Sequence, residues 1–299
     1  MLRTADIQIR DPFILQVDSL FYMFGTTDSS PWSGPGTGFN CYSSSDLELW
    51  DGPFAAFTPP KDFWGVTNYW APEVKQVGDQ FFMTATFCAN SGSRGTAILV
   101  SDHPTGPYLP HSDGPVTPPD WMCLDGTLFE QAGQMWLAFC REWTEVIDGQ
   151  IYAQQLSADL THAIGHPQLL FSASQAPWAR PITDERTQGV PSFVTDGPFL
   201  HGLSDGALLM MWSSFGQGGY TVGLVRSDSG LLAGPWTHLA DPLWPQDGGH
   251  GMLFFDPTGQ LQLSLHAPND TPLERAVFHP VQEIADPQHP GHLTLACRQ

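Results

Sequence analysis

Three aspartates and a histidine open apolar segments that lie far apart in the chain. Asp11, Asp125, Asp196 and His250 each precede a Pro or a Gly and then a short apolar run. Carboxylates and imidazoles are the side chains that most often transfer protons in catalysis. Two carboxylates on either side of one bond can act as general acid and general base, which is the arrangement used to hydrolyse glycosides. This chemistry requires a fold that brings the distant residues into one cavity.

The four residues belong to a repeat of five similar units, which open at positions 11, 71, 125, 196 and 250. Each unit is a short apolar strand, a turn rich in Gly, Asp or Ser, and a second apolar strand, which is the pattern of a β-hairpin. Three units continue into a third segment that contains Ser-Asp in each case: Tyr42-Ser-Ser-Ser-Asp-Leu, Leu99-Val-Ser-Asp-His and Val225-Arg-Ser-Asp-Ser. The units open 54–71 residues apart. Repeats of roughly 40–60 residues, with several strands each, are typical of propeller blades. The sequence therefore predicts an all-β, five-bladed β-propeller, with residues 1–299 as a single catalytic domain.

The composition agrees with one large globular β domain. The chain has 299 residues, of which 41% are hydrophobic and 14% charged, with 30 Gly and 27 Pro. Such a chain is long enough for a substantial core, and no stretch of ten or more residues has helical periodicity. A large sandwich or jelly roll is the alternative all-β fold, but neither accounts for the repeated opening of the units.

In a propeller the first strand of each blade lies beside the central axis, so the residues that open these strands point into one funnel. The five opening residues are Asp11, Ala71, Asp125, Asp196 and His250. Gathering carboxylates is unfavourable, because burial and like charges both raise their pKa values. An Asp before Pro or Gly is alternatively a turn residue that hydrogen-bonds its own backbone. Three such residues at equivalent repeat positions favour a catalytic site.

Charge and cysteine content exclude several classes of partner. Asp and Glu number 31 against 11 Lys and Arg, a formal net charge of -20, and such a surface repels phosphate backbones and anionic membranes. We therefore expect no nucleic-acid and no membrane partner; the charge alone also serves solubility. Five cysteines without a metal-ligand spacing favour a reducing compartment. Since the N-terminus has no apolar run, the expected location is cytoplasmic, or secreted if a signal peptide has been removed.

Four motifs resemble glycoside hydrolase family 43, whose members are five-bladed propellers that act on arabinose- and xylose-containing polysaccharides. In chain order they are Ile9-Arg-Asp-Pro-Phe-Ile, Tyr69-Trp-Ala-Pro-Glu-Val, Leu124-Asp-Gly-Thr-Leu-Phe and Gly248-Gly-His-Gly. The resemblance spans nearly the whole chain, and the order and spacing of the motifs make it specific. It implies that Asp11 is the general base, that Asp125 modulates the pKa of the general acid, and that His250 lies near the axis.

The general acid departs from the family pattern. The family carries a Glu in a Glu-Gly-Pro stretch, whereas this chain has Val194-Thr-Asp-Gly-Pro-Phe, which puts Asp196 in that place. An aspartate carboxyl lies about 1.5 Å further back, and proton transfer needs hydrogen-bond reach. We expect Asp196 to be the acid. Glu142 is the alternative, because it follows the second strand of the third unit and should return to the same rim; Glu73 is a further alternative.

Aromatic and charged residues near these carboxylates are candidates for substrate binding. Trp70 and Trp143 flank the expected site, and sugars stack on aromatic faces; packing between blades is the alternative for either residue. Glu73 is expected to contact the substrate as well. Arg94 and Arg180 are candidates to bind a hydroxyl or orient a carboxylate, because the chain has few basic residues.

His250 has two interpretations besides a contact with substrate. A lone histidine usually makes a structural hydrogen bond. Alternatively, the resemblance implies a metal role, since some relatives hold a cation near the propeller axis through a histidine and waters. We expect no required cofactor, with a structural calcium ion near the axis as the alternative.

These observations predict an inverting glycoside hydrolase that removes pentose residues, above all α-L-arabinofuranosyl groups, from plant-type polysaccharides or oligosaccharides. The Thr-Asp-Gly-Pro-Phe-Leu and Gly-Gly-His-Gly stretches resemble the arabinofuranosidase-type branch of the family. A β-xylosidase or an endo-arabinanase of the same fold is the alternative within the class. A non-catalytic carbohydrate-binding propeller is the alternative from another class, because the family's Glu is replaced by Asp.

Overall fold

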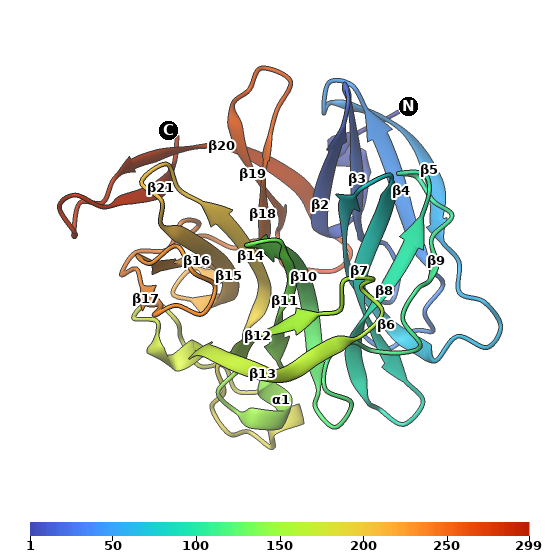
Figure 1. The fold of residues 1–299 in the computed structure, drawn as a ribbon, viewed down its shortest axis with the longest axis horizontal. Helices are drawn as coiled ribbons and strands as arrows, with labels where there is room; N and C mark the ends of the chain where they lie inside the picture. The colour runs from blue at the N-terminus through green and yellow to red at the C-terminus, as the bar shows by residue number, and fades with distance from the viewer. Residues whose placement is uncertain (299) are drawn as a thin grey trace.

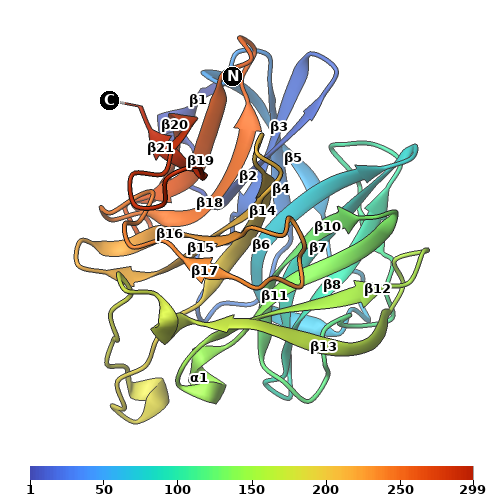
Figure 2. The ribbon, with the colours of Figure 1, turned by 60° about the vertical axis from the view of Figure 1, so that its left-hand side comes forward.

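The computed structural model describes residues 1–298 and confirms the five-bladed β-propeller (Figure 1, Figure 2). Five antiparallel sheets surround one axis, and the first and last blades lie side by side in both views. Each sheet consists of strands that are consecutive in the chain, with β1 added at the outer edge of the first blade. Among residues 1–298 there is no helix with the length and apolar character needed to span a bilayer.

The strands of each blade follow one another from the axis outward. Blade 1 contains β2 (Arg10–Val17), β3 (Leu20–Thr26), β4 (Phe39–Ser44), β5 (Leu49–Phe57) and β1 (Leu2–Arg3). Blade 2 contains β6 (Gly65–Val77), β7 (Gln80–Ala89), β8 (Arg94–Ser101) and β9 (Leu109–Pro110). Blade 3 contains β10 (Cys123–Gln131), β11 (Gln134–Arg141), β12 (Gln150–Leu156) and β13 (Ala163–Ser172).

The last two blades are built in the same way. Blade 4 contains β14 (Asp196–Gly202), β15 (Leu208–Gly216), β16 (Gly219–Ser227) and β17 (Thr237–His238). Blade 5 contains β18 (Gly249–Phe255), β19 (Leu261–Ala267), β20 (Arg275–Ala285) and β21 (Leu293–Cys297). The helical segments of the described chain are short: η1 (Thr4–Asp6), α1 (Trp143–Val146), η2 (Ala173–Gln175) and η3 (Glu185–Thr187).

Each interface between neighbouring blades has its own apolar cluster. A blade cannot bury both of its faces alone, so radial stacking supplies the core. In order around the ring, the five clusters contain the buried side chains Phe87, Phe139, Trp212, Leu263 and Trp50. The last of these closes blade 5 on blade 1. The ring is therefore closed by side-chain packing, which fixes the inner strands around the axis.

The residue that opens each inner strand adopts a left-handed backbone conformation. The φ angle lies between 46° and 54° at Asp11, Ala71, Asp125, Gly197 and His250. Each of the five lies inside a register shift between the first and second strands of its blade. A bulge of this kind bends the strand and re-aims the side chain. Non-glycine residues rarely adopt this conformation, so its recurrence marks a constraint that all five blades share.

This equivalence corrects one position expected from the sequence. The repeat alignment puts Asp196 in the same column as Asp11, but the left-handed residue of β14 is Gly197. Asp196 lies one residue earlier and takes the place that Arg10 has in the first blade. The reason is that a proline follows the left-handed residue in three blades, at Pro12, Pro72 and Pro198. In these three blades the residue before the proline, rather than the aspartate, therefore marks the equivalent position.

The backbone N–H of each left-handed residue donates a hydrogen bond that joins its blade to the preceding blade of the ring. In four blades its N–H donates over 2.8–3.2 Å to a side chain at the end of a neighbouring second strand: Ala71 to Thr26, Asp125 to Thr86, His250 to Ser213 and Asp11 to His266. In blade 3 the corresponding second-strand residue is Cys140. The Gly197 N–H donates instead to Asp125 Oδ2, at 3.1 Å.

The inter-blade hydrogen bond of Ser213 predicts a difference between two adjacent serines. Ser213 and Ser214 are both fully buried on β15, but the Ser214 hydroxyl has no hydrogen-bond partner among the described residues. We expect Ser213→Ala to lower the free energy of unfolding by about 1–3 kcal/mol, because it leaves the His250 N–H unpaired. Ser214→Ala, the matched control, should change it little. Chemical denaturation measures both, and equal losses would contradict a structural role for this hydrogen bond.

Candidate active site

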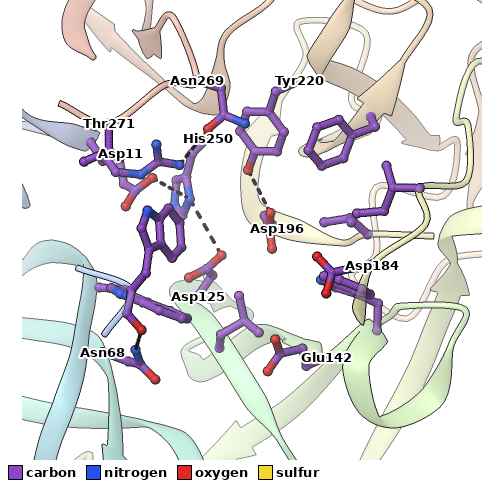
Figure 3. A pocket seen from close by; sticks show the side chains of 18 of the residues that line it. Asp11, Asn68, Asp125, Glu142, Asp184, Asp196, Tyr220, His250, Asn269 and Thr271 are labelled. Carbon is purple, nitrogen blue, oxygen red and sulfur yellow. Dashed lines mark hydrogen bonds and ion pairs between the residues drawn. The ribbon is translucent and has the colours of Figure 1, made fainter. Parts of the chain in front are cut away.

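A cavity of about 770 Å³ lies where the inner strands begin (Figure 3). Its volume is in the range of small-ligand sites. The propeller brings the carboxylates of Asp11, Asp125 and Asp196 together there with the imidazole of His250. Glu142, at the N-terminus of α1 directly after β11, lines the same cavity. With Trp70 of β6, residues on or next to all five inner strands therefore meet at one site.

Asp11 is held as an ionised carboxylate. Its Oδ2 accepts a hydrogen bond from the Thr26 hydroxyl at 2.7 Å, and its Oδ1 lies 3.3 Å from Nδ1 of His250. Burial alone would raise the pKa of Asp11, but His250, Arg10 and the Thr26 hydrogen bond outweigh it and hold the pKa below its usual value. A carboxylate that stays ionised can accept a proton, which is what a general base does.

Asp196 and Asp125 are instead biased toward the protonated form. Burial, followed by the charge of Asp125, raises the pKa of Asp196 to about 7. Burial, followed by the charge of Asp11, raises the pKa of Asp125 to about 8. The charge of Asp125 opposes ionisation of Asp196, and the charge of Asp11 opposes ionisation of Asp125, so the two side chains together keep a proton near neutral pH. The cavity thus contains one ionised carboxylate and a protonated pair, which is the requirement for combined acid and base chemistry.

Glu142 forms a buried ion pair with Arg94. The same guanidinium donates a hydrogen bond to Asn68 Oδ1 at 3.1 Å and lies 4.5 Å above the ring of Trp70. The Glu142 carboxyl is therefore engaged by a guanidinium that two further side chains hold in place. The charge of Glu142 contributes to the raised pKa of Asp196.

Three tryptophans of the cavity wall are each covered on one side by an arginine. The guanidinium carbons lie 4.5–4.7 Å from the ring centroids in the pairs Arg10–Trp32, Arg94–Trp70 and Arg186–Trp143. Each of these arginines also pairs with a carboxylate: Glu274, Glu142 and Asp184, respectively. Such stacking fixes aromatic side chains without adding net positive charge to the cavity.

The predicted binding residues are placed differently from one another. Trp70 and Trp143 line the cavity, but Trp143 is only 5% exposed and is mostly used in packing. Glu73 is buried and is not among the described lining residues, because Trp70 and Ala71 occupy the opening of β6 and Glu73 lies further along the strand. Arg180 donates its hydrogen bonds to backbone carbonyls and lies outside the lining as well.

Sequence reasoning missed two residues of this centre, His266 and Tyr220. Burial lowers the pKa of His266 to about 3, so its ring is neutral; Nδ1 accepts the Asp11 N–H, and Nε2 lies 3.3 Å from Asn269 Oδ1. An alignment of the second-strand ends would have found it, since His266 takes the place of Thr26. Tyr220 lies on a third strand, β16, for which the repeat gives no functional signal.

The imidazole of His250 lies between two carboxylates of the cavity. Nδ1 of His250 faces two carboxylates, at 3.3 Å from Asp11 and 3.7 Å from Asp125. Within residues 1–298 no group of three or more His, Cys, Asp or Glu side chains is arranged to hold a metal ion. A structural calcium ion near the axis, the alternative to no required cofactor, stays a prediction.

Known proteins with the same architecture were found by sequence and by structure. The model of the family described as Glycosyl hydrolases family 43 matches residues 5–283. The crystal structure of an endo-arabinase from Bacteroides thetaiotaomicron VPI-5482 is 42% identical, with a TM-score of 0.86, over 93% of this chain and 96% of that chain. The comparison with curated proteins returned no match.

Two further solved structures share the fold at lower identity. A thermostable family-43 glycoside hydrolase is 23% identical with a TM-score of 0.78, over 98% of this chain and 93% of that chain. An endo-1,4-beta-xylanase from Bacteroides thetaiotaomicron VPI-5482 is 22% identical with a TM-score of 0.73, over 98% and 95%. Because the family model covers nearly the whole chain and agrees with the motifs and the five-bladed fold, this chain belongs to glycoside hydrolase family 43.

Proposed function

We propose that this glycoside hydrolase cleaves α-L-arabinofuranosidic bonds in arabinan-type glycans with inversion of configuration. Asp11 is the general base and Asp196 the general acid. The observation that carries the proposal is the contrast across one cavity between an ionised Asp11 and a protonated Asp125–Asp196 pair. The arabinose preference is supported by the motif resemblance and by the similarity to an endo-arabinase at 42% identity.

The reaction needs one proton transfer on each side of the sugar. Asp11 accepts a proton from a water molecule, whose oxygen attacks the anomeric carbon on the face opposite the leaving group. Asp196 donates its proton to the glycosidic oxygen as that bond breaks, so the new C–O bond forms with inverted configuration. Inverting enzymes leave room for the water with carboxyl groups about 6.5–9.5 Å apart. Asp125 helps to raise the pKa of Asp196, because simultaneous ionisation of both neighbouring carboxyls is unfavourable.

Asp196 is favoured over Glu142 as the acid by what each carboxyl contacts. Glu142 is paired with Arg94 and is 3% exposed, so placing a transferable proton on it would require giving up a buried ion pair. Asp196 has a neutral hydrogen-bond partner, the Tyr220 hydroxyl, at 2.9 Å. Its raised pKa matches the role of an acid at neutral pH.

The point of attack on the polysaccharide has two candidates. The motif resemblance supports removal of terminal arabinofuranosyl residues. Cleavage within the arabinan chain is the second candidate, favoured by the 42% identical endo-arabinase. With linear arabinan, terminal removal releases arabinose from the start, whereas internal cleavage releases oligosaccharides and lowers viscosity early. Aryl β-D-xyloside and xylan serve as comparison substrates, and faster turnover of either would overturn the arabinose preference.

Leaving-group dependence tests the acid. Loss of general-acid catalysis should cost Asp196→Ala about 10²–10⁴-fold on aryl α-L-arabinofuranosides with poor leaving groups and far less on those with good ones. Glu142→Gln, the comparison variant, should affect both kinds alike. Asp11→Asn should lose activity on all of them, because the base acts on every substrate. If Asp11→Asn equals the unchanged protein and neither turns over any pentoside, a carbohydrate-binding propeller replaces the enzyme.

The opposed pKa shifts predict the pH dependence of kcat/KM. Activity requires Asp11 without its proton and Asp196 with it. The acidic limb should lie below the pH at which an ordinary aspartate titrates, because the pKa of Asp11 is lowered. The alkaline limb should fall at about pH 7, where Asp196 loses its proton. Rates on a substrate with a poor leaving group measure both limbs, and a rate that stays constant well above neutral pH would contradict the assignment.

A further inference from the structure

Tyr220 connects the acid and base sides of the cavity. It is 4% exposed on β16, and its hydroxyl donates a hydrogen bond to Asp196 Oδ2 at 2.9 Å (Figure 3). Its ring stacks on the imidazole of His266, with centroids 5.7 Å apart and planes 26° from parallel. His266 in turn accepts the N–H of Asp11. One side chain therefore touches both the carboxyl of the acid and the histidine that supports the base.

The chain makes room for this ring at one position. Gly249 lies directly before the left-handed residue of β18, at the place where the other inner strands carry Arg10, Trp70, Leu124 and Asp196. A Cβ added to Gly249 would collide with the Tyr220 ring. The missing side chain at this position is thus what lets Tyr220 reach Asp196.

Asp196 is restrained at its backbone end as well. The following N–H, that of Gly197, donates to Asp125 Oδ2 at 3.1 Å. That N–H is available because Cys140 occupies the position of the hydroxyl acceptors Thr26, Thr86 and Ser213. Asp125 thus holds the peptide after the acid, and the Tyr220 hydroxyl holds its carboxyl.

We propose that Tyr220 is a positioning residue that fixes the carboxyl of Asp196 and leaves Oδ1 as the oxygen that carries the transferable proton. The inference rests on the proposed role of Asp196 as general acid. Because the phenol donates to Oδ2, a proton on the carboxyl resides on Oδ1. An aspartate in the place of the family's glutamate has a side chain that is one methylene shorter. A fixed orientation is therefore needed for its proton to reach the glycosidic oxygen.

Tyr220 remains a hydrogen-bond donor under working conditions. Burial, followed by the charge of Asp196, holds the pKa of Tyr220 well above its usual value. The hydrogen bond stabilises the ionised form of Asp196 and so lowers the pKa of that carboxyl, against the larger effect of burial. Removing the hydroxyl should therefore free the Asp196 carboxyl to rotate and at the same time raise the pKa of Asp196.

Tyr220→Phe tests the proposal, because it keeps the ring on His266 and removes only the hydroxyl. For aryl α-L-arabinofuranosides with poor leaving groups we expect kcat to fall by about 10²-fold, the scale for a misplaced catalytic group. With good leaving groups kcat should stay within about 2-fold of the unchanged protein, since they need little acid assistance. The alkaline limb of the pH profile should move to higher pH.

Two more variants separate positioning from folding. Tyr108→Phe is the matched control: its hydroxyl is also bonded once, to the Pro104 carbonyl at 3.0 Å, but outside the cavity lining, and it should change neither kcat nor the alkaline limb. Gly249→Ala should reproduce the leaving-group dependence of Tyr220→Phe by displacing the ring. Losses equal for good and poor leaving groups, or an unmoved alkaline limb in Tyr220→Phe, would overturn the positioning role.

Asp196→Ala, assayed in parallel, distinguishes failure of this inference from failure of the proposed function. If Asp196→Ala keeps its activity on poor leaving groups, Asp196 is not the acid, and both the proposed mechanism and the role of Tyr220 fail. If Asp196→Ala loses that activity while Tyr220→Phe behaves like Tyr108→Phe, the mechanism stands and only the role of Tyr220 is refuted.

Discussion

Each inner strand begins with a buried N–H that must find an acceptor outside its own blade, and this requirement determines where the catalytic side chains lie. A buried backbone donor without a partner is costly, so the neighbouring second strand provides Thr26, Thr86, Ser213 or His266 at its end. The same bulge that presents the N–H turns the opening side chain off the sheet. The second strand of blade 3 has Cys140 at this position, and there the Gly197 N–H donates to Asp125 instead.

The electrostatics of the cavity follow from this arrangement. Asp11 lies beside His250, Arg10 and the Thr26 hydroxyl, which offset its burial, whereas the equally buried Asp125 and Asp196 lie beside each other and near the charge of Glu142. Carboxylates of one type thus acquire opposite protonation states because neighbouring blades offer them different partners. The few arginines near the cavity are matched with carboxylates, so the cavity accepts a neutral sugar without a net cationic surface.

The repeat was sufficient to predict the fold and the meeting of Asp11, Asp125 and His250, because equivalent positions in a propeller share one axis. The repeat alignment misplaced Asp196 by one residue, because it matched acidic residues, whereas the left-handed position in β14 is Gly197, the residue before the proline. The repeat could not find Tyr220, because that contact depends on the absence of a side chain at Gly249, a feature of packing between blades. Glu73 was expected at the cavity because its motif opens a blade, but Ala71 holds the opening place.

The anomeric configuration of the first product tests most directly the claim that a base and an acid act from opposite sides of the sugar. Proton NMR of an α-L-arabinofuranoside during turnover, recorded before the sugar mutarotates, identifies the anomer that the enzyme releases. Base catalysis by Asp11 on a water molecule predicts that β-L-arabinofuranose appears first and the α anomer later. Initial release of the α anomer would mean retention through a covalent intermediate and would contradict the roles assigned to Asp11 and Asp196.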